Sequence, residues 1–314
     1  MKTSMKTVRL RLPATSANLG PGFDAMALAL ELFLEIEATP GPQFSITATG
    51  RNQNICAGLT RNLLIQTYES VLSAQLRPVV PLEIHMRNGI PVGMGCGSSA
   101  AVRLAAVALA SAFGHLDWDA AKIVEQAVRI EGHPDNVAAC WHGGLTIAAN
   151  AQELAIISIP PPAHWRALLV LPETPVATAK ARGMLPVSYG RQDVVANLQC
   201  AALLTAAFAL GRADLMQLAT QDRLHQPYRL ELCPLLPALL PLAGNHGVMS
   251  VTLSGAGPAV LLLTQEPETL EEALEEAILE LARPVCPVEI LATQLCRGSA
   301  EISLLEQAPT IIKG

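Results

Sequence analysis

A glycine-studded loop that runs directly into an alanine-rich apolar stretch constrains this chain more than any other feature. Residues 91–110 read PVGMGCGSSAAVRLAAVALA. Alanine has the highest helix propensity, and a serine can cap the first N–H groups, so the pattern predicts a buried helix over Ser98–Phe113. Unpaired N–H groups and the dipole at a helix start favour an anion, and glycines let it approach closely. The loop is therefore either a phosphate site or a structural turn that feeds a buried helix.

The loop matches neither of the two common nucleotide-binding motifs. It does not end in Gly-Lys-Ser/Thr, and it is not a Gly-x-Gly-x-x-Gly turn after a strand of a dinucleotide fold. Two other segments concentrate polar groups: PATSANLGPGFD at 13–24, and EGHPDNV at 131–137. The first is a surface turn or a substrate loop. The second contains side chains that are costly to bury without partners, unless they cap a helix.

Periodicity predicts an α+β chain with two parts. Alternation marks strands at 8–12, ended by Pro13, and at 44–48 and 82–86, while helices are expected at 63–73 and at 118–130, capped by Asp117. The polar stretch 150–153 and three prolines at 160–162 suggest a boundary, which we place between 1–155 and 156–314. The second part alternates strands and helices, typical of an antiparallel sheet with helices on one face. The tail after Ile302 carries no signal.

Composition narrows the classes of function. Hydrophobic residues make up 51% of the chain and charged residues 15%, whereas about 25% charged is typical, so extensive burial and a subunit interface are expected. A net charge of −6 without basic runs argues against a nucleic-acid partner. Apolar stretches fall short of the roughly 18 residues of a membrane span. Seven scattered cysteines without a Cys-x-x-Cys pair predict a reduced, cytoplasmic protein.

Three motifs in order along the chain carry a family resemblance. PATSANLGPGFD at 13–24, PVGMGCGSSAA at 91–101 and SGAGPAV at 254–260 together resemble the motifs of the GHMP kinases. Within that superfamily, TSANLGPGFD combined with HPDN at 133–136 is similar to the homoserine kinases. The resemblance implies an N-terminal mixed sheet-and-helix domain, of the type of ribosomal protein S5 domain 2, and a C-terminal ferredoxin-like α+β domain. It also implies ATP in the cleft between them, and a homodimer.

The resemblance also implies which residues hold Mg-ATP. Glu125, ten residues before Asp135, matches the family's magnesium carboxylate, with Ser98 beside it; without the resemblance it would be a solvated helix residue. Cys96 departs from the family pattern, which more often has leucine there, but it is still small and apolar. The implied ATP-binding residues are Pro91, Gly93, Met94, Gly95, Cys96, Gly97, Ser98, Ser99 and Asn62.

An amino-acid acceptor such as L-homoserine is a zwitterion and needs partners of both signs. Guanidinium groups bind carboxylates in a bidentate manner, and Arg182 and Arg229 match the family's carboxylate ligands, although alone each would be an ordinary surface arginine. The matching partners for the ammonium group and the rest of the substrate site are Asn18, Asp24, Asp135, Thr178 and Gly257.

The implied catalytic cluster is His133, Asp135 and Asn136. Asn136 is expected near the acceptor hydroxyl, and His133 is expected to orient the cluster, although a lone histidine is more often structural. Phosphoryl transfer depends mainly on positioning and charge stabilisation, so a general base is not required. We therefore expect Asp135 to bind substrate.

Three functions remain open on the sequence alone. The first is ATP-dependent phosphorylation of L-homoserine on the route to threonine. The second is a GHMP kinase that phosphorylates another small alcohol such as mevalonate. The third is a catalytically silent ligand-binding protein on the same fold, because a fold does not fix a function.

Overall fold

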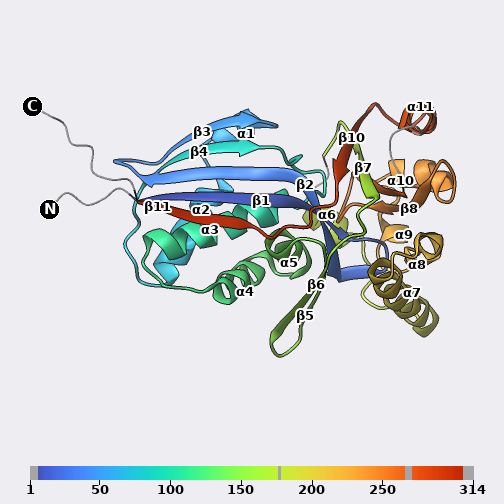
Figure 1. Cartoon of the computed structure of the whole chain (residues 1–314), viewed down its shortest axis with the longest axis horizontal. Coiled ribbons are helices and arrows are strands. Elements are labelled where there is room, and N and C mark those ends of the chain that lie inside the picture. Colours follow the sequence, from blue (N-terminus) through green and yellow to red (C-terminus); the bar gives the residue numbers. More distant parts are fainter. Residues whose placement is uncertain (1–5, 176–177, 266–270, 307–314) are drawn as a thin grey trace, which may run out of the picture.

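The chain forms two β-sheets that follow one another along the long axis of the molecule (Figure 1). This computed structural model describes residues 6–175, 178–265 and 271–306. In the larger sheet the strand order is β11-β1-β2-β4-β3, with β5 paired to β2 and β6 to β5. β3 and β4 are parallel, and the other pairs are antiparallel. The strands of this sheet are β1 (Lys6–Asn18), β2 (Gly22–Pro40), β3 (Ser45–Gly50), β4 (Leu82–Asn88), β5 (Leu145–Asn150), β6 (Leu154–Ile159) and β11 (Glu301–Glu306).

β1 and β2 form one long hairpin that extends beyond the predicted strand. Val8 and Leu10 are buried while Arg9 between them is exposed, as the alternation predicts. The prediction that Pro13 ends the strand is wrong, because β1 continues to Asn18. The pairing register shifts between Pro13 and Ala14, and a bulge tolerates a proline that cannot donate to the ladder. The motif at 13–24 is therefore the end of a hairpin and not a free loop.

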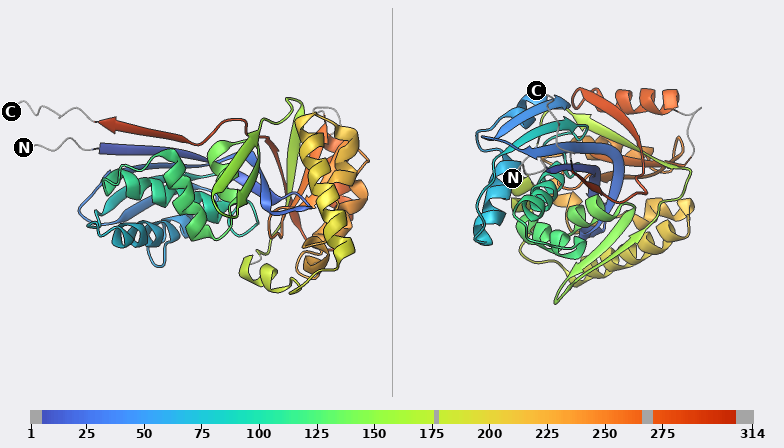
Figure 2. Two further views of the ribbon diagram at one scale, coloured as in Figure 1. Left: turned by 90° about the horizontal axis from the view of Figure 1, so that it is seen from below. Right: turned by 60° about the vertical axis from the view of Figure 1, so that its left-hand side comes forward.

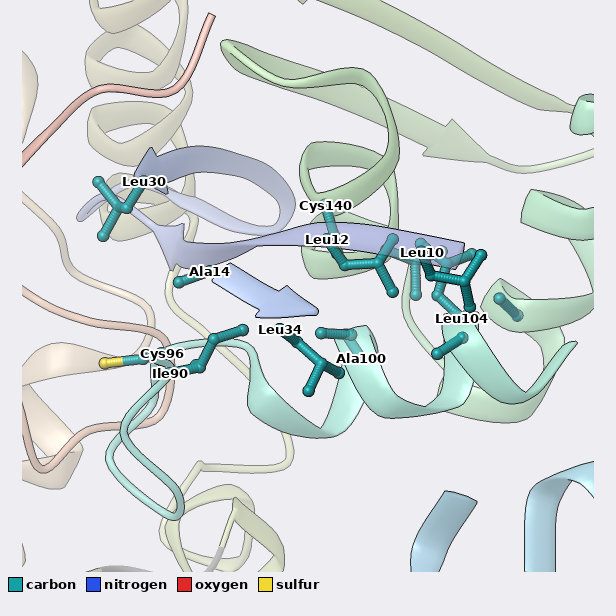
Figure 3. Close-up of a cluster of buried hydrophobic side chains, with 14 of the residues drawn as sticks. Leu10, Leu12, Ala14, Leu30, Leu34, Ile90, Cys96, Ala100, Leu104 and Cys140 are labelled. Carbon is teal, nitrogen blue, oxygen red and sulfur yellow. The ribbon is translucent and has the colours of Figure 1, made fainter. Parts of the chain in front are cut away.

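Helix α3 (Ser98–Phe113) lies under β1 and spans the residues that the sequence predicts. Figure 3 shows Leu10 and Leu12 directed from the strand toward Ala100 and Leu104 of the helix. The alanines allow the helix to approach the sheet closely, and most of its side chains are buried. Burial of apolar area at about 25 cal/mol per Å² explains why a helix with almost no polar face is stable here. The glycine loop is therefore fixed to a rigid element.

Five helices accompany the larger sheet, and Figure 2 shows α2 to α5 gathered on one of its faces. The predicted cap Asp117 is wrong by two residues: Asp119 accepts a hydrogen bond from the backbone of Lys122, and Asp117 itself has a positive φ. The predicted linker at 150–153 is the turn between β5 and β6. The five helices are α1 (Gln53–Ala57), α2 (Leu63–Ala74), α3, α4 (Ala120–Glu131) and α5 (Asp135–His142).

The smaller sheet is antiparallel, in the order β10-β7-β9-β8, and its strands and most of its helices come from the second half of the chain. Apolar residues of β7, β8 and β9 pack against α10 and α11 to form a second core. The elements are β7 (Trp165–Pro172), β8 (Val248–Leu253), β9 (Val260–Gln265), β10 (Val288–Gln294), α6 (Thr178–Gly183), α7 (Arg191–Ala209), α8 (Met216–Ala219), α9 (Gln226–Arg229), α10 (Leu235–Leu239) and α11 (Glu271–Ala282), with short 3₁₀ turns at Ala213–Leu215 and Leu240–Leu242.

The end of the chain returns to the larger sheet. β11 pairs with β1 from Lys6↔Glu306 to Arg11↔Glu301, although no sequence pattern after Ile302 predicts a strand. The division of the chain between residues 155 and 156 stays a prediction. The strand pairings show that β6 and β11 both belong to the larger sheet. Among the described helices, none is both long and apolar enough to cross a membrane.

Candidate active site

A pocket opens where the two halves of the chain meet, and the three motifs converge on it. It is bordered by the glycine loop, the end of the β1–β2 hairpin, the start of α5, α6, α9 and the loop after β8. Its cavity of about 100 Å³ has the size of one small polar molecule. The lining residues are Ala17, Asn18, Phe23, Asp24, Gly93, Gly95, Cys96, Gly97, Ser98, Ser99, Glu131, His133, Asp135, Asn136, Arg182, Arg229, Gly255 and Ala256.

The glycine loop has a backbone that only glycine adopts easily. Gly93, Gly95 and Gly97 all have positive φ, between 72° and 78°. A Cβ atom at Gly95 would overlap the carbonyl of Ser254, and one at Gly97 would overlap the hydroxyl of Thr15. Gly97, and not a serine, occupies the N-cap of α3, so the hydroxyls of the two following serines make no cap hydrogen bond. The loop therefore offers backbone N–H groups and two serine hydroxyls at a helix start.

The end of the β1–β2 hairpin is fixed by Asn18. Its Nδ2 donates to the carbonyl of Gly255 at 2.9 Å, and its Oδ1 accepts from the backbone N–H of Asp24 at 3.1 Å. Asn18 is buried and has a φ of 71°, a conformation that asparagine tolerates. Both polar atoms of its side-chain amide are thus used. One bond fixes the turn within the motif at 13–24, and the other joins this motif to the motif at 254–260. Asn18 lines the pocket, but its main role in this structure is architectural.

Asp24 and Arg182 form a bidentate ion pair across the pocket. Nη1 and Nη2 of Arg182 lie 2.9 and 2.5 Å from the two carboxylate oxygens of Asp24. The hydrogen bond and charge of Asp24 outweigh partial burial and raise the pKa of Arg182. Both side chains remain about one third exposed, so another ion can reach either partner.

The segment at 131–137 places a carboxylate, an imidazole and an amide at the start of α5. Oδ1 of the buried Asp135 accepts from His133 Nδ1 at 2.8 Å, from the Asn136 backbone at 2.6 Å and from Asn136 Nδ2 at 3.1 Å. Oδ1 of Asn136 accepts from Thr15 Oγ1 at 2.7 Å, which fixes the amide orientation. Burial lowers the pKa of His133, but the hydrogen bond and charge of Asp135 outweigh it, so the pKa is raised. The predicted catalytic residues are brought together.

Glu131 is the carboxylate that faces the glycine loop, and the sequence analysis did not select it. Its Oε2 accepts from Ser99 Oγ at 3.3 Å and pairs with Arg103 of α3, and its side chain is 8% exposed. Its Oε1 lies 4.0 Å from His133 Nε2. The signal that could have found it is its place two residues before the HPDN motif.

Arg229 is a buried guanidinium at the floor of the pocket. It is 1% exposed, and its partners are the carbonyls of Ala181 and Gly255, both at 3.3 Å, and Nδ1 of His225 at 3.0 Å. In the described part of the chain no carboxylate forms a salt bridge with it. Burial and the nearby charge of Arg182 lower its pKa. An unpaired buried cation is costly, so this pocket favours an anionic group.

Comparison with known proteins agrees with this geometry. The family models for the GHMP kinases N-terminal and C-terminal domains match residues 62–144 and 204–281. The homoserine kinase of Solibacter usitatus is 40% identical over 88% of this chain and 91% of that protein, and that of Moorella thermoacetica is 40% identical over 80% and 86%. The chain belongs to the homoserine kinases of the GHMP family.

Solved structures of homoserine kinases share the fold. The crystal structure from Cytophaga hutchinsonii superposes with a TM-score of 0.79 at 22% identity, covering 95% of this chain and 97% of that one. A putative homoserine kinase from Listeria monocytogenes gives a TM-score of 0.73 at 27% identity, covering 94% and 99%. The expected two-part α+β GHMP fold is confirmed.

Glu125, the carboxylate predicted from the homoserine kinase pattern to bind magnesium, lies elsewhere. It pairs with Lys122 on the surface of α4, has a side chain 52% exposed, and lines a separate hollow with His142 and Leu154. Glu125 precedes Glu131 by six positions on α4. At about 100° per residue, the two carboxylates therefore point to different sides of the helix. The structure therefore does not place Glu125 beside the glycine loop, and the phase of α4 is the reason.

Several other residues predicted for the site do not line the pocket. Asn62 caps α2 through Leu64 and Ile65 and donates to Gly58, so its side chain is a structural cap and the prediction that it binds ATP is not supported. The side chain of Thr178 lies outside the described residues. Pro91, Met94 and Gly257 are absent from the pocket lining. Burial raises the pKa of the Cys96 thiol to about 12, so Cys96 fills space.

Asp24, His133 and Asp135 bring one ligand atom each within 4.8 Å of one another, a spacing that a metal ion could use. Most of their ligand atoms already have protein partners, however: Arg182 takes both oxygens of Asp24, and His133 and Asn136 share Oδ1 of Asp135. The carboxylate that lies beside the glycine loop is Glu131, which does not belong to this group of three.

Proposed function

We propose that this protein transfers the γ-phosphoryl group of ATP to the side-chain hydroxyl of L-homoserine. One observation carries the proposal: the pocket beside the glycine loop combines Arg229, buried without a carboxylate partner, with two carboxylates, Asp24 and Asp135. Groups of both signs in one small pocket suit a zwitterion of amino-acid size. The membership in the homoserine kinases and the anion-binding loop support the same reaction.

The glycine loop suits the phosphates of ATP. Gly95 and Gly97 cannot accept a Cβ without overlap, and α3 directs its N-terminal N–H groups and dipole toward the loop. Glu131, with Ser98 or Ser99, would hold magnesium, because this ion prefers oxygen ligands and takes one or two carboxylates. When bound, the ion neutralises charge that develops on the transferred phosphoryl group. Arg103 fixes one oxygen of Glu131, which leaves Oε1 to face the pocket.

We expect Gly97→Ala to weaken ATP binding. A side chain at Gly97 would overlap Thr15 Oγ1, and its φ of 72° adds a strain of about 1–2 kcal/mol for an L-residue. The KM for ATP should rise at least about tenfold, because the loop must move away from β1. Gly211→Ala is the matched control: it has the same left-handed φ but only Pro162 nearby, at 3.9 Å. Equal KM values for ATP in both variants would contradict the role of the loop.

The acceptor end of the pocket can exchange one ion pair for two. The ammonium group of L-homoserine would replace Arg182 at Asp24, and its carboxylate would bind Arg182 and Arg229. After this exchange every charged group in the pocket still has a partner of opposite sign. The free-energy cost of desolvating these groups therefore stays compensated when the substrate is bound. All three hydrogen bonds to Asp135 go to Oδ1, which leaves Oδ2 for the substrate.

Catalysis in this proposal depends on positioning. Thr15 holds the amide of Asn136, and Asp135 holds both Asn136 and His133, so the cluster presents a fixed set of donors to the acceptor hydroxyl and the phosphoryl group. Orientation of reactants and electrostatic stabilisation supply most of the rate enhancement in phosphoryl transfer. No residue is assigned as an obligatory general base.

The experiment that tests the proposal is ADP release by the purified protein with Mg-ATP. The acceptors compared are L-homoserine, mevalonate, L-serine and none. Release with L-homoserine alone supports the proposal. Release with mevalonate would keep the kinase but overturn the acceptor, and binding of ATP without any release would favour the silent protein.

The variant Asp24→Asn distinguishes two kinds of acceptor substrate, an amino acid and an alcohol without an amino group. With L-homoserine, we expect kcat/KM to fall about 10²-fold, because a hydrogen bond to a charged group is worth about 1.5–3 kcal/mol and Arg182 also loses its partner. An acceptor without a cation would lose little. The measurement is kcat/KM for L-homoserine, with Asp193→Asn, a surface partner of Arg223, as the control. An unchanged value in Asp24→Asn would contradict the assignment.

A cytoplasmic location and a homodimer complete the proposal. All seven cysteines are free, which supports a reducing compartment. The homodimer rests on the family resemblance, and the mass in solution by light scattering tests it.

A further inference from the structure

His225 is fully buried next to Arg229, and no part of the proposed reaction uses it. It precedes α9 and is 0% exposed. Its Nε2 lies 2.8 Å from the carbonyl of Gly20, at the tip of the β1–β2 hairpin 205 residues away in sequence. Its Nδ1 lies 3.0 Å from Nη1 of Arg229. One imidazole thus joins the hairpin to the buried guanidinium.

The partners fix the protonation state of this ring. A carbonyl only accepts, so Nε2 carries the proton, and a guanidinium only donates, so Nδ1 is an acceptor. His225 must therefore be neutral. Burial, together with the charge of Arg229, lowers its pKa to about 4, even though Asp222 raises it. A protonated ring would direct a second donor at Arg229 and break the contact.

His225 is the closest of the partners that hold Arg229. The carbonyls of Ala181 and Gly255 lie at 3.3 Å, against 3.0 Å for the imidazole. Both carbonyls belong to segments that carry other pocket residues, α6 and the loop after β8. The imidazole connects Arg229 to the tip of the hairpin of the larger sheet, through the carbonyl of Gly20.

The same ring supports Phe23 in the pocket wall. The Phe23 and His225 rings stack with centroids 5.3 Å apart and an interplanar angle of 27°. The guanidinium carbons of Arg182 and Arg229 each lie 5.5 Å from the Phe23 centroid. The Phe23 ring therefore lies near both cations and packs against the face of His225.

We propose that His225 is a positioning residue for acceptor binding: it sets the guanidinium of Arg229 and the ring of Phe23 at the carboxylate end of the pocket. This inference rests on the proposed function, because it takes Arg229 as the ligand of the acceptor carboxylate. His225 itself lines no part of the pocket and touches no reacting atom.

The test compares His225→Phe with His225→Gln. Phenylalanine keeps a ring that can stack on Phe23 but has no acceptor for Arg229, whereas glutamine has both an acceptor and a donor. We expect His225→Phe to raise the KM for L-homoserine about 10- to 100-fold with kcat and the KM for ATP nearly unchanged, because a hydrogen bond to a charged group is lost. His225→Gln should restore the KM to within about threefold of the unsubstituted protein, since its polar groups can replace both bonds.

Phe208→Leu is the control for general destabilisation, because Phe208 is buried against Trp165 and away from the pocket. Each variant is also followed by thermal unfolding. Equal KM increases for both substrates, a failure of glutamine to rescue, or the same KM increase in Phe208→Leu would overturn the positioning role. If the unsubstituted protein releases no ADP with L-homoserine, the proposed function fails and this inference with it. An active protein with an unchanged His225→Phe variant rejects this inference alone.

Discussion

Arg229→Leu should raise the KM for L-homoserine by about 10²–10³-fold, because breaking a buried charge pair costs about 3–5 kcal/mol and 1.4 kcal/mol is tenfold. Leucine fills similar space without a charge, so the fold is retained while the partner of the acceptor carboxylate is lost. The carboxylate does not react, and the interaction is made equally in the ground state and the transition state. The loss therefore falls on KM, and kcat and the KM for ATP stay close to their original values.

Arg223→Leu is the matched control for this variant. Arg223 lies six residues away, its side chain is 61% exposed, and it pairs with Asp193 on the surface. Surface pairs contribute at most about 1 kcal/mol, so its kinetic constants should change little. Steady-state kinetics with each substrate varied in turn measure the effect. Equal increases in both KM values for Arg229→Leu would argue against binding of the acceptor carboxylate.

Glu131→Gln should lower kcat/KM by about 10²–10³-fold and raise the magnesium concentration needed for half-maximal rate, because ligands to catalytic charge are worth several kcal/mol. Glu131 is the carboxylate that contacts a serine of the phosphate-binding loop. Glutamine is nearly isosteric and can still accept from Ser99, but it lacks the charge that attracts a divalent cation. Magnesium titrations of the rate, and binding of Mn²⁺ followed by its paramagnetism, measure the effect.

Glu125→Gln is the control, and it sits on the same helix with the same chemistry. Because its side chain faces solvent and pairs with Lys122, we expect the magnesium requirement to stay unchanged. Thermal unfolding of Glu131→Gln must also be followed, since Arg103 loses a charged partner. A larger effect at Glu125 than at Glu131 would restore the prediction made from the sequence.

Local chemistry made part of this site predictable. A positive-φ turn needs glycine, and an alanine-rich run needs burial, so the loop and the exact span Ser98–Phe113 follow from neighbouring residues. The HPDN cluster is contiguous, so its members must lie together whatever the rest of the chain does. These features depend on interactions within a few residues.

The tertiary structure decided which charges meet. Asp24 reaches Arg182 over 158 residues, and Gly20 reaches His225 over 205. Glu131 and Glu125 differ in sequence only by six positions, but the phase of α4 buries the first beside Arg103 and leaves the second in solvent. The ionisation and role of such groups depend on desolvation and on partners brought by distant segments, and these terms exist only once the two sheets are packed together.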